Sequence, residues 1–226
     1  MQFALVVSTE ESTSLRAVVV CRKQTTPPAT ALAGQELHLK QKRSPAHSTS
    51  EVVAKYVSLC PNIRLFQRSV NRGVAAARNI GVKLSAGRFI TFLDSDDEYA
   101  VNHLALRRRI LQNNSDIRML HGGLRIIGNP FVVDKDNPCK TIHLTECEVG
   151  GTFVIKRDVF QEIGGFEDLS YAEDSNFFET AIESGIHCQA VNHPSYIYYR
   201  NTNGQLTSQQ FGKNGQSNSS RVPLAE

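Results

Sequence analysis

Residues 88–97 read RFITFLDSDD, an apolar run that ends directly in three aspartates. The apolar part, 88–93, shows no alternation of polar and apolar residues, which predicts a strand buried on both faces of a sheet. Asp94 and Asp96 then fall at the carboxyl edge of that sheet, where open α/β sheets bind ligands. Carboxylates this close repel one another unless a hard cation neutralises them, and such a cation suits a diphosphate. An acidic turn that caps the following helix would explain the same residues without any ligand.

Strands and helices alternate along the chain on both sides of this strand. Such alternation is typical of an α/β domain with a mostly parallel central sheet flanked by helices. Residues 204–226, which are rich in Ser, Gln and Asn, are expected to be a disordered tail, so that one domain occupies residues 1–203. The other expected strands are 3–8, 15–21, 63–66, 118–127, 152–155, 187–191 and 196–200, and the expected helices are 50–59, 74–85, 99–113, 157–163 and 174–184.

Composition narrows the classes of function. The 226 residues carry a net charge of +3, which is too mild for a dedicated nucleic-acid binder. Hydrophobic residues at 40% and charged residues at 21% are ordinary for a soluble globule, and no apolar run approaches the ~20 residues that a membrane span needs. The five cysteines are scattered and form no CxxC pair, which favours reduced thiols in the cytoplasm over a disulfide framework or a zinc knuckle.

Two further segments carry side chains suited to chemistry. Glu173 and Asp174 open the expected helix 174–184, where the helix dipole favours an ionised carboxylate that can accept a proton; an ordinary N-cap is the alternative. Residues 71–81 read NRGVAAARNIG, whose small residues allow a helix to pack closely on the sheet. From that helix Arg78 could reach a phosphate or a nucleotide, although the segment matches neither GxGxxG nor a Walker pattern.

Taken in order, these segments resemble the family 2 glycosyltransferases of the GT-A fold, over residues 48–207. Residues 71–81 resemble the helix beside the nucleotide in that family, and FLDSDD at 92–97 resembles its DxD motif. GTFVIKRDVF at 151–160, followed by GGF at 164–166, resembles the strand, helix and turn before the acceptor side. Glu173 and Asp174 fall where the family has its ED motif.

The resemblance implies inverting transfer of a sugar from a nucleotide diphosphate sugar to a glycan or lipid-linked acceptor, in polysaccharide, glycolipid or cell-envelope synthesis. It implies that Asp96, helped by Asp94, holds Mg²⁺ or Mn²⁺ against the diphosphate. Asp174 would take the proton of the acceptor hydroxyl and Glu173 would support it. It also implies a cytoplasmic location, with peripheral contact at the inner face of the membrane for a lipid-linked acceptor. The donor-binding residues implied are Arg78, Asn79, Asp94, Ser95 and Asp96.

Two departures from the family pattern leave alternatives open. Residues 37–49 contain no acid where the family has an acidic segment that reads the base, so residues 1–50 are expected to be a divergent nucleotide-binding part. After Tyr199 and Arg200 the matching position is Thr202, where many members have a histidine ligand. One alternative is therefore a catalytically impaired GT-A-like relic that binds nucleotide or sugar weakly. Another is a phosphohydrolase with an aspartate nucleophile. Glu98 argues against it, because that class is expected to have Thr or Val two residues after the second aspartate of DxD.

Overall fold

The computed structural model describes residues 4–9, 15–22, 49–68, 72–94 and 96–200. These ranges leave out Ser95, Thr202, the expected tail 204–226 and all of the acid-free segment 37–49 except Thr49. The domain boundaries expected from the sequence therefore stay a prediction. No helix in the described ranges is long and apolar enough to cross a membrane.

The described strands form one main sheet of seven strands in the order β11-β6-β10-β4-β1-β2-β3, with β4 at its centre. The pairs β11–β6 and β2–β3 are parallel, and the four pairs between them are antiparallel. In that order, the strands are β11 (Cys188–Ala190), β6 (Met119–His121), β10 (Val154–Lys156), β4 (Phe89–Asp94), β1 (Ala4–Thr9), β2 (Leu15–Arg22) and β3 (Ile63–Arg68).

The expected α/β class is confirmed, and the pairings show a mixed sheet where we expected mostly parallel strands. The length of one connection explains part of this difference. Only residues 10–14 separate β1 from β2, whereas a crossover between parallel neighbours needs about a dozen residues or more. So short a connection places the two strands side by side and antiparallel.

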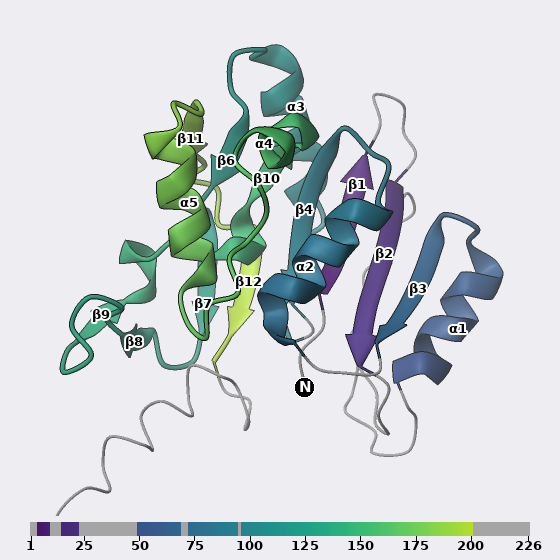
Figure 1. Cartoon of the computed structure of the whole chain (residues 1–226), viewed down its shortest axis with the longest axis horizontal. Helices are drawn as coiled ribbons and strands as arrows, with labels where there is room; N and C mark the ends of the chain where they lie inside the picture. The colour runs from purple at the N-terminus through teal and green to yellow at the C-terminus, as the bar shows by residue number, and fades with distance from the viewer. Residues whose placement is uncertain (1–3, 10–14, 23–48, 69–71, 95, 201–226) are drawn as a thin grey trace, which may run out of the picture.

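The helices flank this sheet, with α2 across β1 and β2 and α1 beside β3 (Figure 1). At the other side of the molecule α5 stands near β6 and β10 (Figure 1). The helices are α1 (Thr49–Leu59), α2 (Gly73–Leu84), α3 (His103–Asn113), α4 (Arg157–Glu162) and α5 (Glu173–Glu183), with short 3-10 turns η1 (Leu144–Glu146) and η2 (Gly150–Thr152).

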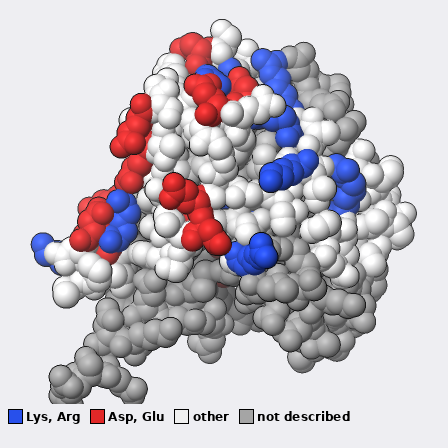
Figure 2. Space-filling view, in the orientation of Figure 1, with Lys and Arg blue, Asp and Glu red and all other residues white. Residues whose placement is uncertain are grey.

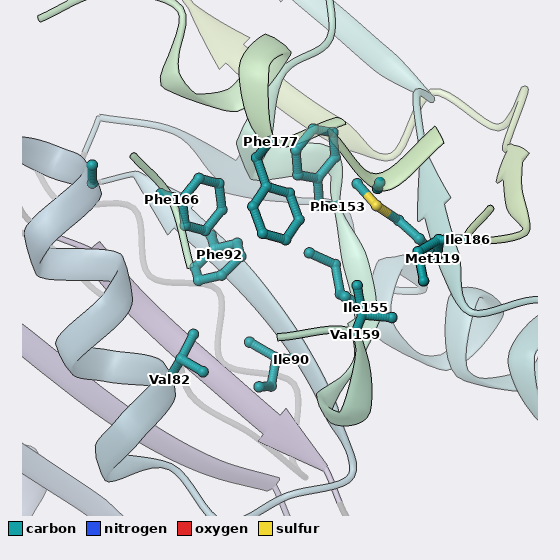
Figure 3. Packing of buried hydrophobic residues seen from close by; sticks show 12 residues of the cluster. Val82, Ile90, Phe92, Met119, Phe153, Ile155, Val159, Phe166, Phe177 and Ile186 are labelled. Atoms are coloured by element: carbon teal, nitrogen blue, oxygen red, sulfur yellow. The ribbon is translucent and has the colours of Figure 1, made fainter. Parts of the chain in front are cut away.

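Strand β4 is buried on both faces, as its unbroken apolar run predicted. Ile90 and Phe92 pack toward α2, α4 and α5, in a cluster where the rings of Phe92, Phe166 and Phe177 point toward one another (Figure 3). The rings of Phe166 and Phe177 are stacked with their centroids 4.4 Å apart. Phe89, which alternates with Ile90, packs instead with Leu111 of α3 and other residues. The strand therefore packs against a core cluster on each of its faces, and its last residue is Asp94.

Two smaller sheets differ from what the sequence suggested. The expected helix 99–113 begins only at His103, because residues 98–99 form the strand β5 against β12. The expected strand 118–127 is split into β6 and β7 by Gly122 and Gly123, both at positive φ (75° and 73°). The three-stranded sheet contains β5 (Glu98–Tyr99), β12 (Tyr196–Tyr199) and β7 (Leu124–Ile127), and the two-stranded one contains β8 (Phe131–Val133) and β9 (Thr141–His143).

Charge is unevenly distributed over the surface. On the face drawn in Figure 2, Lys and Arg gather toward the α2 side, whereas Asp and Glu gather toward α4 and α5. The sequence places eight acids and no Lys or Arg in residues 158–183. Six of the eight are exposed, whereas Glu173 and Asp174 are only partly exposed. Most of this acidic stretch is therefore solvated surface, and two of its carboxylates are turned inward.

Candidate functional site

The side chains that the sequence singled out meet around one buried arginine. Arg78, on α2, is 2% exposed. Its Nη1 donates to Oε1 of Glu173, at the start of α5, over 2.9 Å. Its Nη2 lies 3.3 Å from Oδ2 of Asp94, at the end of β4. One guanidinium thus joins the carboxyl end of the central strand to the first turn of α5.

The surroundings of Arg78 explain how a cation can be buried here. The centre of its guanidinium lies 5.6 Å from the ring centroid of Phe92 and 5.3 Å from that of Phe166. Aromatic faces attract cations, and the two carboxylates supply the opposite charge. Gly150 closes the space: a Cβ atom there would lie 2.8 Å from Nη1 of Arg78. Any larger residue at position 150 would therefore push into the ion pair.

Asp174 is held by backbone groups. Its Oδ2 accepts the N–H of Gly150 in η2 over 2.9 Å, and its Oδ1 accepts the N–H of Ser175 over 3.0 Å. Ala172, directly before α5, lies in the left-handed region (φ 57°), an unusual conformation for a residue with a side chain. This turn brings the two acids of α5 to the end of β4. Both oxygens of Asp174 have a fixed direction, which suits a group that must receive a proton at one place.

The carboxylates perturb one another. Burial raises the pKa of Asp94, with Asp96 and Asp174 adding to the rise and Arg78 opposing it. Burial likewise raises the pKa of Glu173, against the pull of Arg78. Burial alone would lower the pKa of Arg78, but Asp94 and Glu173 outweigh it and raise that pKa above its usual value. The cluster is therefore a concentrated negative site with one internal cation, and it favours any further positive charge or proton.

The other predicted residues lie around this cluster. Asp96 is exposed just after β4, whereas Ser95 is not described. Asn79 binds the backbone of Phe166: its Nδ2 donates to the carbonyl of Phe166 and its Oδ1 accepts the N–H of Phe166, each over 2.8 Å. Both polar groups of Asn79 therefore hold the GGF turn, and its contact with a donor stays a prediction.

Sequence reasoning gave no role to Asp97, which is 7% exposed. It accepts the hydroxyl of Tyr196 over 2.6 Å and the N–H of Tyr199 over 3.0 Å. Burial, with Asp94 as the next cause, raises the pKa of Asp97 to about 8. Asp97 thus holds β12 next to the end of β4 through these two hydrogen bonds. No local pattern could have revealed this, because its partners lie about a hundred residues further along the chain.

The turn η2 also belongs to the site, although an ordinary turn was the preferred interpretation of its glycine pair over a close approach to the substrate. Gly150 meets Asp174 and Arg78, and a Cβ atom on Gly151 would lie 2.1 Å from the hydroxyl of Tyr196. The signal in the sequence was the adjacent glycine pair directly before a strand, which an ordinary turn explains equally well.

The carboxylates that the sequence predicts as metal ligands are those of Asp94 and Asp96. In the described ranges no group of three His, Cys, Asp or Glu residues could hold a metal ion. Mg²⁺ is commonly bound by only one or two carboxylates together with substrate phosphates. An exposed Asp96 next to a partly buried Asp94 fits a divalent cation of that kind, which arrives with a diphosphate.

The chain is similar to known glycosyltransferases. The family model of Glycosyl transferase family 2 matches residues 44–164, and Glu173 and Asp174 lie beyond that match. An Escherichia coli protein, UDP-Glc:alpha-D-GlcNAc-diphosphoundecaprenol beta-1,3-glucosyltransferase WfgD, is 31% identical over 162 residues, which are 66% of this chain and 60% of the relative.

Two solved structures share the fold at low identity. Staphylococcus aureus TarS 1–349 in complex with UDP has a TM-score of 0.52 and 21% identity, over 67% of this chain and 47% of TarS. The mannosyltransferase PcManGT from Pyrobaculum calidifontis, in complex with GDP-Man and Mn²⁺, has a TM-score of 0.51 and 19% identity, over 76% of this chain and 53% of PcManGT. The chain thus spans 60% or less of the length of these proteins. With a family model matched over more than half of its residues and a GT-A fold, the chain belongs to glycosyl transferase family 2.

Proposed function

We propose that this chain transfers a sugar, with inversion, from a nucleotide diphosphate sugar to an acceptor hydroxyl in the synthesis of a cell-envelope glycan. One observation carries the proposal: Arg78 joins Asp94, at the end of β4, to Glu173, next to Asp174, at the start of α5. A donor-side carboxylate and a proton acceptor thus belong to one cluster. Transfer needs the donor-side carboxylate and the proton acceptor to lie close to the same sugar.

On the donor side, Asp94 and Asp96 would hold Mg²⁺ or Mn²⁺ against the diphosphate. Such a cation screens the charge that the leaving diphosphate gains as its bond to the sugar breaks. The position of Asp96 supports this role, because it is a solvent-exposed acid two residues after Asp94 at the end of β4. The Mn²⁺ and GDP-Man bound to PcManGT support it by analogy.

On the acceptor side, Asp174 would take the proton of the attacking hydroxyl. A bond forms between the acceptor oxygen and the anomeric carbon, the bond from that carbon to the diphosphate breaks, and the proton passes to Asp174. The Gly150 and Ser175 N–H groups fix the direction of the carboxylate that receives it. Glu173, held by Arg78, would keep this end of α5 in place.

The acceptor that we propose is a lipid-linked glycan at the cytoplasmic face of the membrane. WfgD supports this choice, since its name specifies a GlcNAc-diphosphoundecaprenol acceptor. The proposal adds peripheral membrane contact, through the acceptor, to a chain whose described helices cannot span a bilayer.

The test is a transfer assay with UDP-, GDP-, CDP- and dTDP-sugars, a diphosphoundecaprenol-linked acceptor, and Mn²⁺. We expect transfer from one donor class, a loss of roughly 100-fold or more in Asp174→Asn, and unchanged affinity for the nucleotide in that variant. Asp96→Asn should instead weaken Mn²⁺-dependent nucleotide binding. Asp168→Asn is the matched control, because Asp168 is an exposed acid six residues before Asp174.

Transfer by Asp174→Asn at the wild-type rate would remove Asp174 from this role. If no nucleotide raised the melting temperature of the wild-type protein with or without Mn²⁺, the donor site would be lost and the relic interpretation would replace the proposal.

A further inference from the structure

Helix α3 buries a second cation that the proposed reaction does not use. Arg107 is 0% exposed and shares one face of the helix with His103 and Leu111, at intervals of four residues. Burial lowers its pKa to about 10, so it stays charged near neutral pH. Within the described residues no ion pair joins it to a carboxylate, and its Nε has no hydrogen-bond partner.

Both terminal nitrogens of Arg107 donate to backbone carbonyls. Nη1 donates to the carbonyl of Thr152 over 3.0 Å, and Nη2 donates to that of Gly122 over 2.6 Å. Gly122 lies in the turn between β6 and β7, whereas Thr152 ends η2. The planar fork of a guanidinium fixes two acceptors relative to one another, which a single donor could not do.

The side chain of Thr152 fastens the same two turns a second time. Its hydroxyl donates to the carbonyl of Val149 over 2.7 Å and accepts the N–H of Gly122 over 3.0 Å. Thr152 is 1% exposed, so these bonds are shielded from water. The turn η2 is thus fixed at its last residue from α3 and from the β6–β7 turn.

The first residue of the same turn faces the proton acceptor. The N–H of Gly150 donates to Oδ2 of Asp174, and a Cβ atom on Gly150 would lie only 3.1 Å from the Cβ of Asp174. Only Gly151 therefore lies between Thr152, which is bonded to Arg107, and Gly150, which is bonded to Asp174. A shift of η2 would move the donor that orients the carboxylate.

The cost of burying Arg107 argues that its role exceeds packing. A buried cation without a carboxylate partner is expensive, and apolar residues of similar volume are often as stabilising or more so. What they cannot supply is a pair of directed, charge-assisted hydrogen bonds to two separate turns.

We propose that Arg107 is a positioning residue, which holds η2 through Thr152 so that the Gly150 N–H fixes the orientation of Asp174. The inference rests on the proposed function, in which Asp174 receives the proton of the acceptor. Arg107 is 0% exposed, so neither the donor nor the acceptor should contact it. Its loss should therefore act on turnover and not on the affinity for the donor.

The experiment compares Arg107→Met and Arg107→Lys with Lys156→Met. Lys156 is the matched control, because it is also a buried cation bonded to a carbonyl, that of Ser115 over 2.6 Å, at the far end of β10. The first measurement is hydrogen exchange at the Gly150 amide by NMR, which needs no substrate. The second is kcat and the KM for the donor.

We expect faster exchange at the Gly150 amide in Arg107→Met, and a fall in kcat of up to roughly 100-fold, the effect of about 1 Å of misplacement, with the KM for the donor within twofold of wild type. Arg107→Lys should fall between Arg107→Met and wild type, because a lysine can reach one of the two carbonyls. Lys156→Met should leave Gly150 exchange and kcat unchanged.

Wild-type Gly150 exchange in Arg107→Met would overturn the proposal, as would an equal change in Lys156→Met. If Arg107→Met did not fold, the same comparison between Arg107→Lys and Lys156→Met would decide. If the wild-type protein transferred no sugar to any acceptor tried, the proposed function would fail while the exchange measurement still decided whether Arg107 positions η2.

Discussion

Replacing Arg78 with methionine tests the charge balance of the site most directly. Methionine keeps an unbranched side chain beside the rings of Phe92 and Phe166 but removes the cation. The substitution leaves Glu173, whose side chain is 12% exposed, and Asp94, at 25%, without the guanidinium that both now contact. We expect the variant to fold at acidic pH and to be strongly destabilised at neutral pH.

The size of the effect follows from the burial of the pair. Removing one partner of a buried ion pair costs about 3–5 kcal/mol, because the other charge stays buried without compensation. Arg78 now lowers the pKa values of Asp94 and Glu173, against the rise that burial causes, so its loss raises both further. Each unit of that rise is worth about 1.4 kcal/mol per group.

The pH dependence has a definite sign. A carboxyl group whose pKa is higher in the folded than in the unfolded protein makes the folded state bind more protons, so stability falls as pH rises. The loss in free energy of unfolding of Arg78→Met relative to wild type should therefore be smallest near pH 4, which is about the pKa of Asp and Glu in the unfolded protein. It should grow as the pH rises toward the raised pKa values of Asp94 and Glu173 in the folded protein. Urea denaturation at several values between pH 5 and 8 measures this difference in the free energy of unfolding.

Arg109→Met is the control, because Arg109 is an exposed arginine on α3 and its loss should change stability little at any pH. The double variant Arg78→Met with Glu173→Gln should recover part of the loss at pH 8, since one of the stranded charges is gone. A deficit below 1 kcal/mol at pH 8, or one that does not change with pH, would refute the reasoning.

Two further substitutions test single features of the fold. Ala172→Gly should raise the free energy of unfolding by about 1 kcal/mol, because Ala172 has φ 57° and glycine removes the steric cost of the left-handed region; a lower melting temperature would contradict this. Asp97→Asn should flatten the pH dependence: the pKa of Asp97 is raised to about 8, so the wild-type protein should lose stability between about pH 4 and 8. Urea midpoints at pH 5, 7 and 9 measure that slope, and equal slopes in both proteins would be the contrary outcome.

Elements with a strong local pattern could be predicted from the sequence. The small-residue periodicity at 74–85 gave α2 to within one residue at each end, and the apolar run at 88–93 gave β4. The start of α3 was misplaced because Glu98 and Tyr99 pair with β12, almost a hundred residues further along the chain. The directions of the strands were misjudged for a similar reason, since pairing between strands is decided by tertiary contacts.

The candidate site divides in the same way. Arg78, Asp94, Glu173 and Asp174 stand in recognisable motifs, and the structure brings them together. Arg107 gave no signal, because it is a polar residue on the buried face of a helix, where periodicity looks for apolar side chains. The part played by Gly150 depends on a backbone N–H, which every residue except proline possesses and no composition reveals.

The bond between Arg78 and Glu173 joins residues 95 positions apart. Closing a loop of that length costs roughly 4 kcal/mol in chain entropy beyond a constant, and the contact compensates this only when the sheet already holds the two ends near one another. We therefore expect the contacts of Arg78 with Asp94 and Glu173 to form after the rate-limiting step of folding. Substitutions of these residues should accelerate unfolding and leave the refolding rate nearly unchanged, so their harm would show in the lifetime of the folded protein rather than in the speed at which it forms.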